Sequence, residues 1–215
     1  MNTFSPDFRI QHSTALMLGA IPIVGIIIAL APDAWGYENG VLENLQLALI
    51  LYGGALCLTA KDNKALYLCI AAILFAMLMR EVNCGRVLFW SKCGDSFVCA
   101  PPSEYLKWQD IPHGQILHYG AYTATALLCV FSLLRNSVRQ SLRALLRSTH
   151  LPCWEAIILI LATLAHYYTE QSSCGFVAEE SMELLVYAAV ISTIHRYSRG
   201  LQTRTISASA HQHAL

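Results

Sequence analysis

Six long apolar segments separated by polar stretches divide this chain. They cover residues 14–31, 42–60, 65–79, 115–134, 153–168 and 182–194. A helix needs roughly 20 residues to cross a hydrocarbon core about 30 Å thick. The first, second and fourth segments have this length, and the other three reach it when their polar flanks are included. The segments also lack the polar face of a soluble amphipathic helix. The pattern therefore predicts an all-α fold, a polytopic membrane helical bundle of about six transmembrane helices.

Composition supports the membrane assignment. Hydrophobic residues make up 55% of the chain and charged residues 13%, whereas soluble domains carry about 25% charged residues. Fourteen basic residues balance fourteen acidic ones, so no positive field or basic groove favours a nucleic-acid partner. The first apolar segment is longer than the apolar region of a signal peptide, about 7–15 residues, and is predicted to be a retained helix.

The two signs of charge lie on opposite sides of the apolar segments. If the N-terminus is inside, ten of the fourteen Lys and Arg residues lie on the inner side and eleven of the fourteen Asp and Glu residues on the outer side. The positive-inside rule then predicts a multi-pass protein with both termini in the cytoplasm. The predicted organisation is a transmembrane domain over 1–198, with an outer loop over 83–112 and a cytoplasmic amphipathic segment over 135–150. Residues 199–215 are expected to form a disordered tail.

The inner segment 135–150 carries a stripe of arginines at a spacing of four, namely Arg135, Arg139, Arg143 and Arg147. At helical pitch these side chains share one face. Such a helix lies on the membrane surface and binds membrane lipids through their anionic headgroups. Binding of a specific headgroup or of a protein partner stays open as an alternative.

Four cysteines fall in the loops assigned to the outside: Cys84, Cys93, Cys99 and Cys174. An even set on an oxidising face predicts disulfides, and four cysteines allow three pairings. A zinc site formed by the four thiolates is the alternative, although no Cys-x-x-Cys pair is present. The outer loop is interpreted either as a lid over the helix ends or as a brace that stabilises the bundle.

Polar side chains gather at the predicted outer helix ends. A simple explanation exists for most of them, because acids in a first turn stabilise a helix by about 0.3–1 kcal/mol and an amide can join two helices. Glu183 is different, since it lies about a turn inside the sixth segment, where an ionisable group needs a partner or a task. Arg80 is its predicted partner. The complete candidate set is Glu43, Gln46, Arg80, Glu81, His118, His166, Glu180 and Glu183.

Two classes of function fit this set. In the first, His118, His166 and Glu183 hold a divalent metal such as zinc, and metal-bound water hydrolyses or transfers a lipid-linked substrate in the outer leaflet. Glu43, Gln46, Arg80, Glu81 and Glu180 would complete the catalytic site. In the alternative, the protein is a non-catalytic binding or structural protein, or a transporter, and its Arg–Glu network fixes helix packing. Haem between the two histidines is a further hypothesis.

Three stretches carry a resemblance to known proteins: Tyr-Glu-Asn-Gly-Val-Leu-Glu-Asn-Leu-Gln at 37–46, Met-Arg-Glu-Val-Asn-Cys-Gly-Arg at 79–86, and Ala-Glu-Glu-Ser-Met-Glu-Leu-Leu-Val-Tyr at 178–187. Together they resemble a group of uncharacterised bacterial multi-helix inner-membrane proteins. The resemblance implies a bacterial inner (plasma) membrane and brings no known activity.

Overall fold

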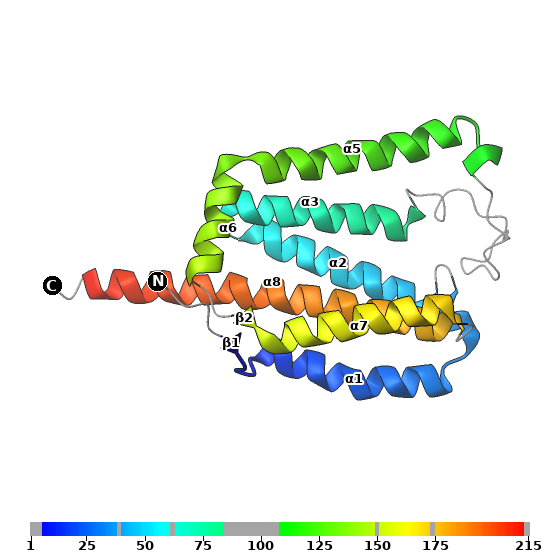
Figure 1. Ribbon diagram of the computed structural model, residues 1–215, viewed down its shortest axis with the longest axis horizontal. Helices are drawn as coiled ribbons and strands as arrows, with labels where there is room; N and C mark the ends of the chain where they lie inside the picture. The colour runs from blue at the N-terminus through cyan, green and yellow to red at the C-terminus, as the bar shows by residue number, and fades with distance from the viewer. Residues whose placement is uncertain are drawn as a thin grey trace.

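The computed structural model of the chain describes residues 6–37, 40–60, 63–83, 108–148, 151–172 and 175–212. Apart from one short pair of two-residue strands, these residues are helical or lie in turns (Figure 1). The long helices are α1 (His12–Leu30), α2 (Val41–Thr59), α3 (Lys64–Glu81), α5 (Gly114–Leu134), α7 (Cys153–Gln171) and α8 (Phe176–Gln212). The shorter elements are η1 (Asp33–Gly36), η4 (Trp108–Asp110), α6 (Asn136–Ser148), β1 (Pro6–Asp7) and β2 (Leu151–Pro152).

Three segments are long and apolar enough to cross a membrane: His12–Leu30, Asp33–Thr59 and Gly114–Leu134. The all-helical class predicted from the sequence is therefore confirmed, and these three segments support the membrane assignment. The helices α3, α7 and α8 follow the remaining three apolar segments, but their ends carry the ionisable side chains that the sequence analysis singled out. The number of membrane crossings stays a prediction.

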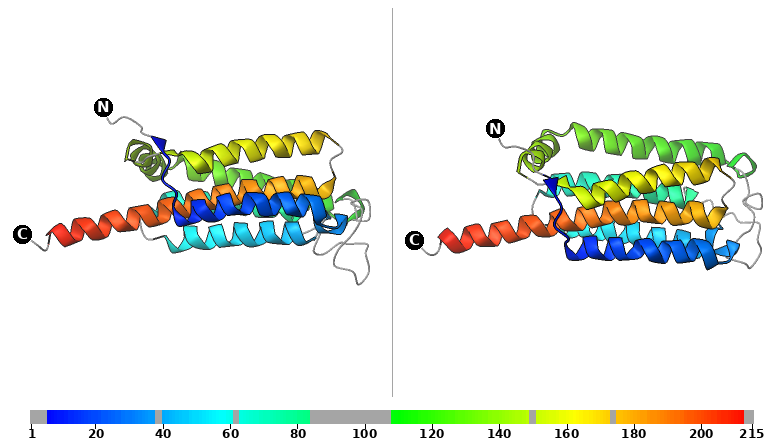
Figure 2. Two further views of the ribbon diagram at one scale, coloured as in Figure 1. Left: turned by 90° about the horizontal axis from the view of Figure 1, so that it is seen from below. Right: turned by 60° about the horizontal axis from the view of Figure 1, so that its bottom comes forward.

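Helix α8 is the central element of the bundle (Figures 1 and 2). It packs against α7, α2 and α1, while α3 packs on the far side of α2 and α5 packs on α3. On one side of α8, Tyr187 and Ile191 join Ile50 in a buried apolar cluster. On the other side, Ala189 packs with Met17 and Ile158. Residues from α8 therefore enter the core on both sides, and α5 remains at the edge.

Two glycines allow close approaches to α8. A Cβ atom at Gly53 of α2 would overlap the Cδ1 atom of Ile191, so α2 and α8 touch at this position. A Cβ atom at Gly36 would lie 2.5 Å from the backbone of Phe176 and Val177, so η1 lies directly against the start of α8. These contacts hold α2 and η1 against α8.

The six long helices alternate in direction and define two ends of the bundle (Figure 1). At one end, called the acidic end here, α1, α3 and α7 finish and α2, α5 and α8 begin. At the other, the basic end, α1, α3 and α7 begin. Helix α6 runs across the bundle at the basic end (Figure 1).

Helix α6 coincides with the amphipathic segment expected from the sequence. Arg135, Arg139 and Arg143 are exposed. Val138 is buried against Leu66 and Cys69 of α3. The helix is therefore fixed to the bundle by its apolar side while these arginines face outward.

The C-terminal segment differs from the prediction, and most of the outer loop lies outside the described residues. Helix α8 continues to Gln212, through the segment expected to be a disordered tail. The segment 199–212 contains Gly200 but no proline, so once α8 has formed, each added residue extends an existing helix without a new nucleus. The four outer-loop cysteines and most of the loop 83–112 lie outside the described residues, so the disulfides stay a prediction. The described cysteines Cys57, Cys69, Cys129 and Cys153 form no disulfide.

Candidate functional site

Four charged or polar side chains meet at the acidic end, where α3 finishes beside α8. The Arg80 guanidinium forms an ion pair with Glu183, and its Nε lies 3.5 Å from Oε1 of Glu81. The Tyr187 hydroxyl lies 2.5 Å from Oε1 of Glu81 and 3.2 Å from Oε1 of Glu183. The hydroxyl carries one hydrogen, so it donates to one carboxylate at a time, and the shorter distance favours Glu81. The pairing of Arg80 with Glu183 is the one expected from the sequence.

Exposure differs sharply within this group. The Arg80 side chain is 58% exposed, whereas the side chains of Glu81 and Glu183 are 7% and 9% exposed. The guanidinium therefore lies at the surface of the bundle and the carboxylates beneath it. Arg80 belongs to the last turn of α3, where a cation also interacts favourably with the helix dipole.

A second set of contacts joins α2 to the beginning of α8. Gln46 is completely buried. Its Nε2 donates to the backbone oxygen of Glu180 at 3.0 Å and to the Oε2 atom of Glu180 at 2.8 Å. Glu180 interacts electrostatically with Glu43, Glu81 and Glu183, so the two sets of contacts share one region. We call this region the carboxylate cluster: Glu43, Gln46, Arg80, Glu81, Glu180, Glu183 and Tyr187.

The cluster holds more negative than positive groups. Among the described residues it contains four carboxyl groups, from Glu43, Glu81, Glu180 and Glu183, and one guanidinium. The first turns of α2 and α8 contain Glu43 and Glu179, and a helix N-terminus stabilises nearby negative charge by about 0.3–1 kcal/mol per group. That contribution is small beside the cost of burying an unpaired carboxylate, which is several kcal/mol. The cluster therefore favours additional positive charge, either a proton on one of its carboxyl groups or a bound cation.

One buried polar atom of the cluster has no hydrogen-bond partner among the described residues. It is Oε1 of Gln46, a residue that is 0% exposed. An unsatisfied buried polar atom costs about 1–3 kcal/mol. Because Nε2 of the same Gln46 amide is already committed to Glu180, its oxygen is left as an acceptor for a further donor. Among the residues that the structure describes, the network of the cluster is thus incomplete.

The two candidate metal-binding histidines lie in different places. His166 of α7 interacts electrostatically with Glu81, and its Nδ1 atom is buried without a partner among the described residues. His118 belongs to α5, which packs on α3, whereas α7 packs on α8 (Figure 1). Its ring contacts those of Trp108, Tyr119 and Tyr122 at centroid distances of 5.1, 5.2 and 4.9 Å.

His118 is therefore part of an aromatic group beside η4. Within the described parts of the chain, no set of three or more His, Cys, Asp or Glu side chains is arranged to hold a metal ion. The sequence places both histidines at a similar depth in the membrane. It does not show which helices pack against each other. The geometry brings Gln46, Arg80, Glu81, Glu180 and Glu183 together and leaves His118 apart.

A second polar network at the basic end was not expected from the sequence. The Glu155 side chain of α7 is 0% exposed and pairs with Arg196 of α8, whose Nη1 lies 3.3 Å from both carboxylate oxygens. The Thr14 hydroxyl donates to Oε1 of Glu155 at 2.5 Å. Nη2 of Arg196 donates to Oδ2 of Asp7 at 2.6 Å, and Nη1 donates to the backbone oxygen of Arg9 at 3.2 Å. We call this group the basal network.

In the sequence, Glu155 is an ionisable residue near the inner end of the fifth apolar segment, and nothing in the pattern names its partner. Its distance from Arg196 in the sequence, forty-one residues, concealed the pair. A detectable signal is that Glu155 lies near the beginning of one apolar segment and Arg196 just after the end of the next, and the alternating topology brings these two positions to the same side. The basal network ties the N-terminal segment to α1, α7 and α8. Trp154 strengthens this attachment, since its Nε1 donates to the backbone oxygen of Phe8 at 3.0 Å.

The electrostatics of Asp7 reflect this network. Partial burial raises the pKa of Asp7, but the Arg9 backbone N–H and the positive charges of Arg196 and Arg9 lower it by more, so the pKa lies below its ordinary value. The carboxylate is thus held in its ionised form beside Arg196. The basal network is internally paired, unlike the carboxylate cluster.

Apolar side chains lie between the two polar regions. Between Tyr187 and Ser192, the buried residues of α8 are Ala189 and Ile191. Ala189 packs with Met17 and Ile158, and Ile191 belongs to the cluster around Ile50. Within the described residues, α8 therefore carries no continuous polar route from one end to the other.

Comparisons of the chain with protein-family models, with curated proteins and with solved structures find no match. The resemblance of the three short motifs stays a prediction.

Proposed function

We propose that the chain is an integral protein of a bacterial inner membrane with six crossings: α1, α2, α3, α5, α7 and α8. The alternating directions of these helices and the bias of basic residues support this topology. It puts both termini in the cytoplasm and the acidic end on the opposite side. The exposed arginines of α6 would then face anionic headgroups of the cytoplasmic leaflet.

We further propose that the carboxylate cluster binds an ammonium group presented from the non-cytoplasmic side. The observation that carries this proposal is the buried Gln46 amide, whose Oε1 has no donor in the described part of the chain and lies beside four carboxyl groups and one guanidinium. An ammonium has up to three N–H donors and one positive charge. It would donate to Gln46 and to the Glu180 carboxylate and would reduce the negative excess. The group could belong to a free amine or to the headgroup of an aminophospholipid.

Two other hypotheses have less support. Metal-dependent hydrolysis would need His118 beside His166 and Glu183, but α5 and α7 lie on different sides of the bundle. Transport would need a polar route inward from Tyr187, but the next buried residues of α8 pack in apolar clusters. A binding function needs neither feature. The cluster also fixes helix packing, because its bonds join α2 and α3 to α8.

Thermal unfolding of the full chain in detergent tests the proposal. Ethylammonium chloride is added to the wild type and compared with sodium chloride at equal ionic strength. A ligand at one hundred times its Kd stabilises the bound state by about 2.7 kcal/mol. For a chain of this size that corresponds to a rise in Tm of about 5–10 °C. Repeating the scan in nanodiscs with phosphatidylethanolamine or with phosphatidylcholine, whose quaternary nitrogen has no N–H, distinguishes a lipid headgroup from a free amine.

Matched variants locate the effect. Glu180→Gln and Gln46→Leu remove one carboxylate or the unpartnered acceptor, and both are expected to abolish the rise caused by ethylammonium. Glu170→Gln is the control, because Glu170 is exposed near the same end of the bundle. An equal rise with sodium chloride, or an unchanged rise in Glu180→Gln, would show that the cluster is not an ammonium site.

A further inference from the structure

Two cysteines on neighbouring helices lie at the same level near the basic end. Cys69 belongs to α3 and Cys129 to α5, and α5 packs on α3 (Figure 1). Cys69 comes five residues after the first residue of α3, and Cys129 comes five residues before the last residue of α5. Because a helix rises by about 1.5 Å per residue, each cysteine lies roughly 7.5 Å inside the basic end.

Helix α5 turns the face that contains Cys129 toward the bundle. Thr125 is buried, and Cys129 follows one turn later on the same side of the helix. Cys129 itself is half-buried, whereas its neighbours Leu128 and Val130 are 49% and 50% exposed. Since α3 is the long helix on which α5 packs, the side chains of Thr125 and Cys129 face α3.

The Cys69 side chain faces the corner where α3, α5 and α6 meet. It is 1% exposed and belongs to a buried cluster with Leu66 of α3 and Val138 of α6. Helix α6 follows α5 directly in the chain. Cys69 also interacts electrostatically with Cys129. Burial, depth and this interaction all place the two thiols opposite each other.

Facing positions on two packed helices have the separation that a disulfide needs. The Cα atoms of a disulfide lie about 4.4–6.8 Å apart. Packed helix axes are about 8–10 Å apart, and each Cα atom lies about 2.3 Å from its axis. Directly facing Cα atoms are therefore roughly 3–6 Å apart, a range that overlaps the one required. A bond between Cys69 and Cys129 would leave the packing of α5 on α3 intact.

We propose that Cys69 and Cys129 form a redox-sensitive pair that a hydroperoxide converts into a disulfide. The more accessible Cys129 reacts first: its sulfur attacks the terminal oxygen, the O–O bond breaks, and a sulfenic acid and an alcohol form. The Cys69 sulfur then attacks this sulfenic acid, the S–S bond forms, and one water leaves. The two thiols lose two electrons in total, and these reduce the hydroperoxide.

The disulfide would fasten the edge helix of the bundle. Cys69 and Cys129 are sixty residues apart in the sequence, and a cross-link that closes a long loop restricts the unfolded chain. It would also hold α5 and the attached α6 on α3 in the folded chain. Oxidation is therefore expected to stabilise the side of the bundle that carries the exposed arginines of α6.

Peptide mapping of the full chain in detergent tests this proposal. The protein is treated with tert-butyl hydroperoxide, unfolded, alkylated and digested, and the peptides are identified by mass spectrometry. We expect a linked pair of peptides that contains Cys69 and Cys129 and that dithiothreitol separates. Linking should raise Tm by about 5–15 °C. In Cys129→Ser neither the linked pair nor the rise in Tm should appear.

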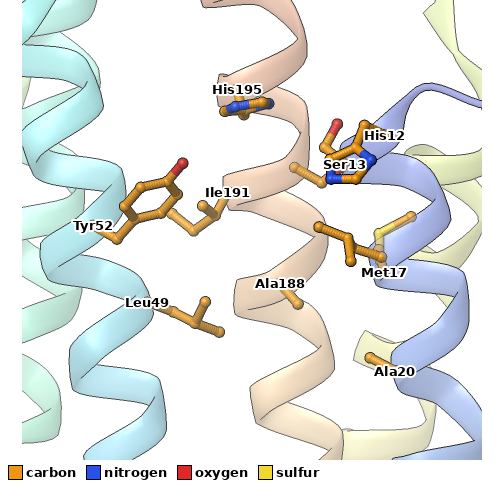
Figure 3. A pocket seen from close by; sticks show the side chains of 11 residues that line it. His12, Ser13, Met17, Ala20, Leu49, Tyr52, Ala188, Ile191 and His195 are labelled. Carbon is orange, nitrogen blue, oxygen red and sulfur yellow. The ribbon is translucent and has the colours of Figure 1, made fainter.

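Two controls test position and selectivity. Cys129→Ser/Val130→Cys moves the thiol one position around α5, to a residue that is half exposed, and should link to Cys69 about tenfold less. Met17 of α1 also lies five residues from the basic end, and it lines a groove of about 380 Å³ between α1, α2 and α8 (Figure 3). At the dose that links half of the cysteine pairs, its thioether should stay unoxidised.

The outcomes separate the site from its effect. Full alkylation of Cys69 and Cys129 after oxidation would overturn the pair, and so would equal linking in the Val130→Cys control. Oxidation of Met17 as fast as the cysteines link would show that the reaction has no selectivity for this site. Complete linking without a rise in Tm would overturn the proposed fastening of α5.

Discussion

Replacing Arg196 by methionine should destabilise the bundle more than almost any other single substitution at its basic end. The Arg196 side chain is 5% exposed and that of Glu155 0% exposed. Removing one partner of a buried ion pair leaves the other charge without compensation and costs about 3–5 kcal/mol. In Arg196→Met, the Glu155 carboxylate keeps the hydrogen bonds from Thr14 and Ser192 but loses its cation. Asp7 loses its 2.6 Å contact with Arg196 as well.

The assay is thermal unfolding of the purified chain in detergent. A change of 1 kcal/mol shifts Tm by about 2–4 °C for a chain of roughly this size, so Arg196→Met is expected to lower Tm by about 6–20 °C. Arg139→Met is the matched control, because Arg139 is exposed on α6 and should change stability by less than about 0.5 kcal/mol.

A double-mutant cycle tests the cause. Glu155→Gln/Arg196→Met removes both charges, so it should be less destabilised than the sum of the two single variants by about 1–3 kcal/mol. If Arg196→Met unfolds at the same temperature as Arg139→Met, the basal network does not contribute to stability as the structure implies. The same conclusion follows if the destabilisations caused by Glu155→Gln and Arg196→Met are additive.

Three further predictions follow from particular contacts. Because the pKa of Asp7 is lowered in the folded chain, its stabilising contribution is complete above about pH 4 and is lost as the pH falls through the lower folded pKa. The difference in Tm between the wild type and Asp7→Asn should therefore narrow as the pH falls from about 5 to about 3, and a constant difference would contradict this. Gly53→Val should lower the free energy of unfolding by about 1–3 kcal/mol, because the added side chain forces α2 away from Ile191. Gly54→Val is the control and should not lower Tm, because a Cβ atom there meets nothing within 4 Å. Equal effects of the two variants would contradict the close approach of α2 and α8. Tyr187→Phe deletes the donor to Glu81 and should lower the free energy of unfolding by about 1–3 kcal/mol. Tyr119→Phe, at an exposed position, should leave the chemical denaturation curve unchanged. Identical denaturation curves for the two variants would refute the buried hydrogen bond.

The sequence was sufficient for the helices and for part of the candidate site. Apolar segments locate helices reliably because a bilayer or a packed bundle leaves little choice for such residues. The pair formed by Arg80 and Glu183 was also predictable, because a deeply placed carboxylate needs a partner and only a few cations lie at that end. Because successive helices run in opposite directions, the sequence also predicts Gln46 and Glu180 at the same end of the bundle.

The remaining features depend on which helices are neighbours, and apolar segments alone do not specify this. His118 and His166 share a depth, yet α5 packs on α3 and α7 packs on α8. The pair of Glu155 and Arg196 depends on α7 and α8 being neighbours. Neighbour relations of this kind follow from side-chain packing, as at Gly53 and Ile191, rather than from hydrophobic periodicity.

Side-specific labelling of a cysteine beside the carboxylate cluster tests the central claim most directly. Glu179→Cys lies in the first turn of α8 and is partly exposed. In intact spheroplasts, a membrane-impermeant thiol reagent should modify this variant above the wild-type background, and ethylammonium should slow the modification while sodium at equal ionic strength should not. Modification only in inside-out vesicles, or a rate that ethylammonium leaves unchanged, would contradict an ammonium site on the non-cytoplasmic side.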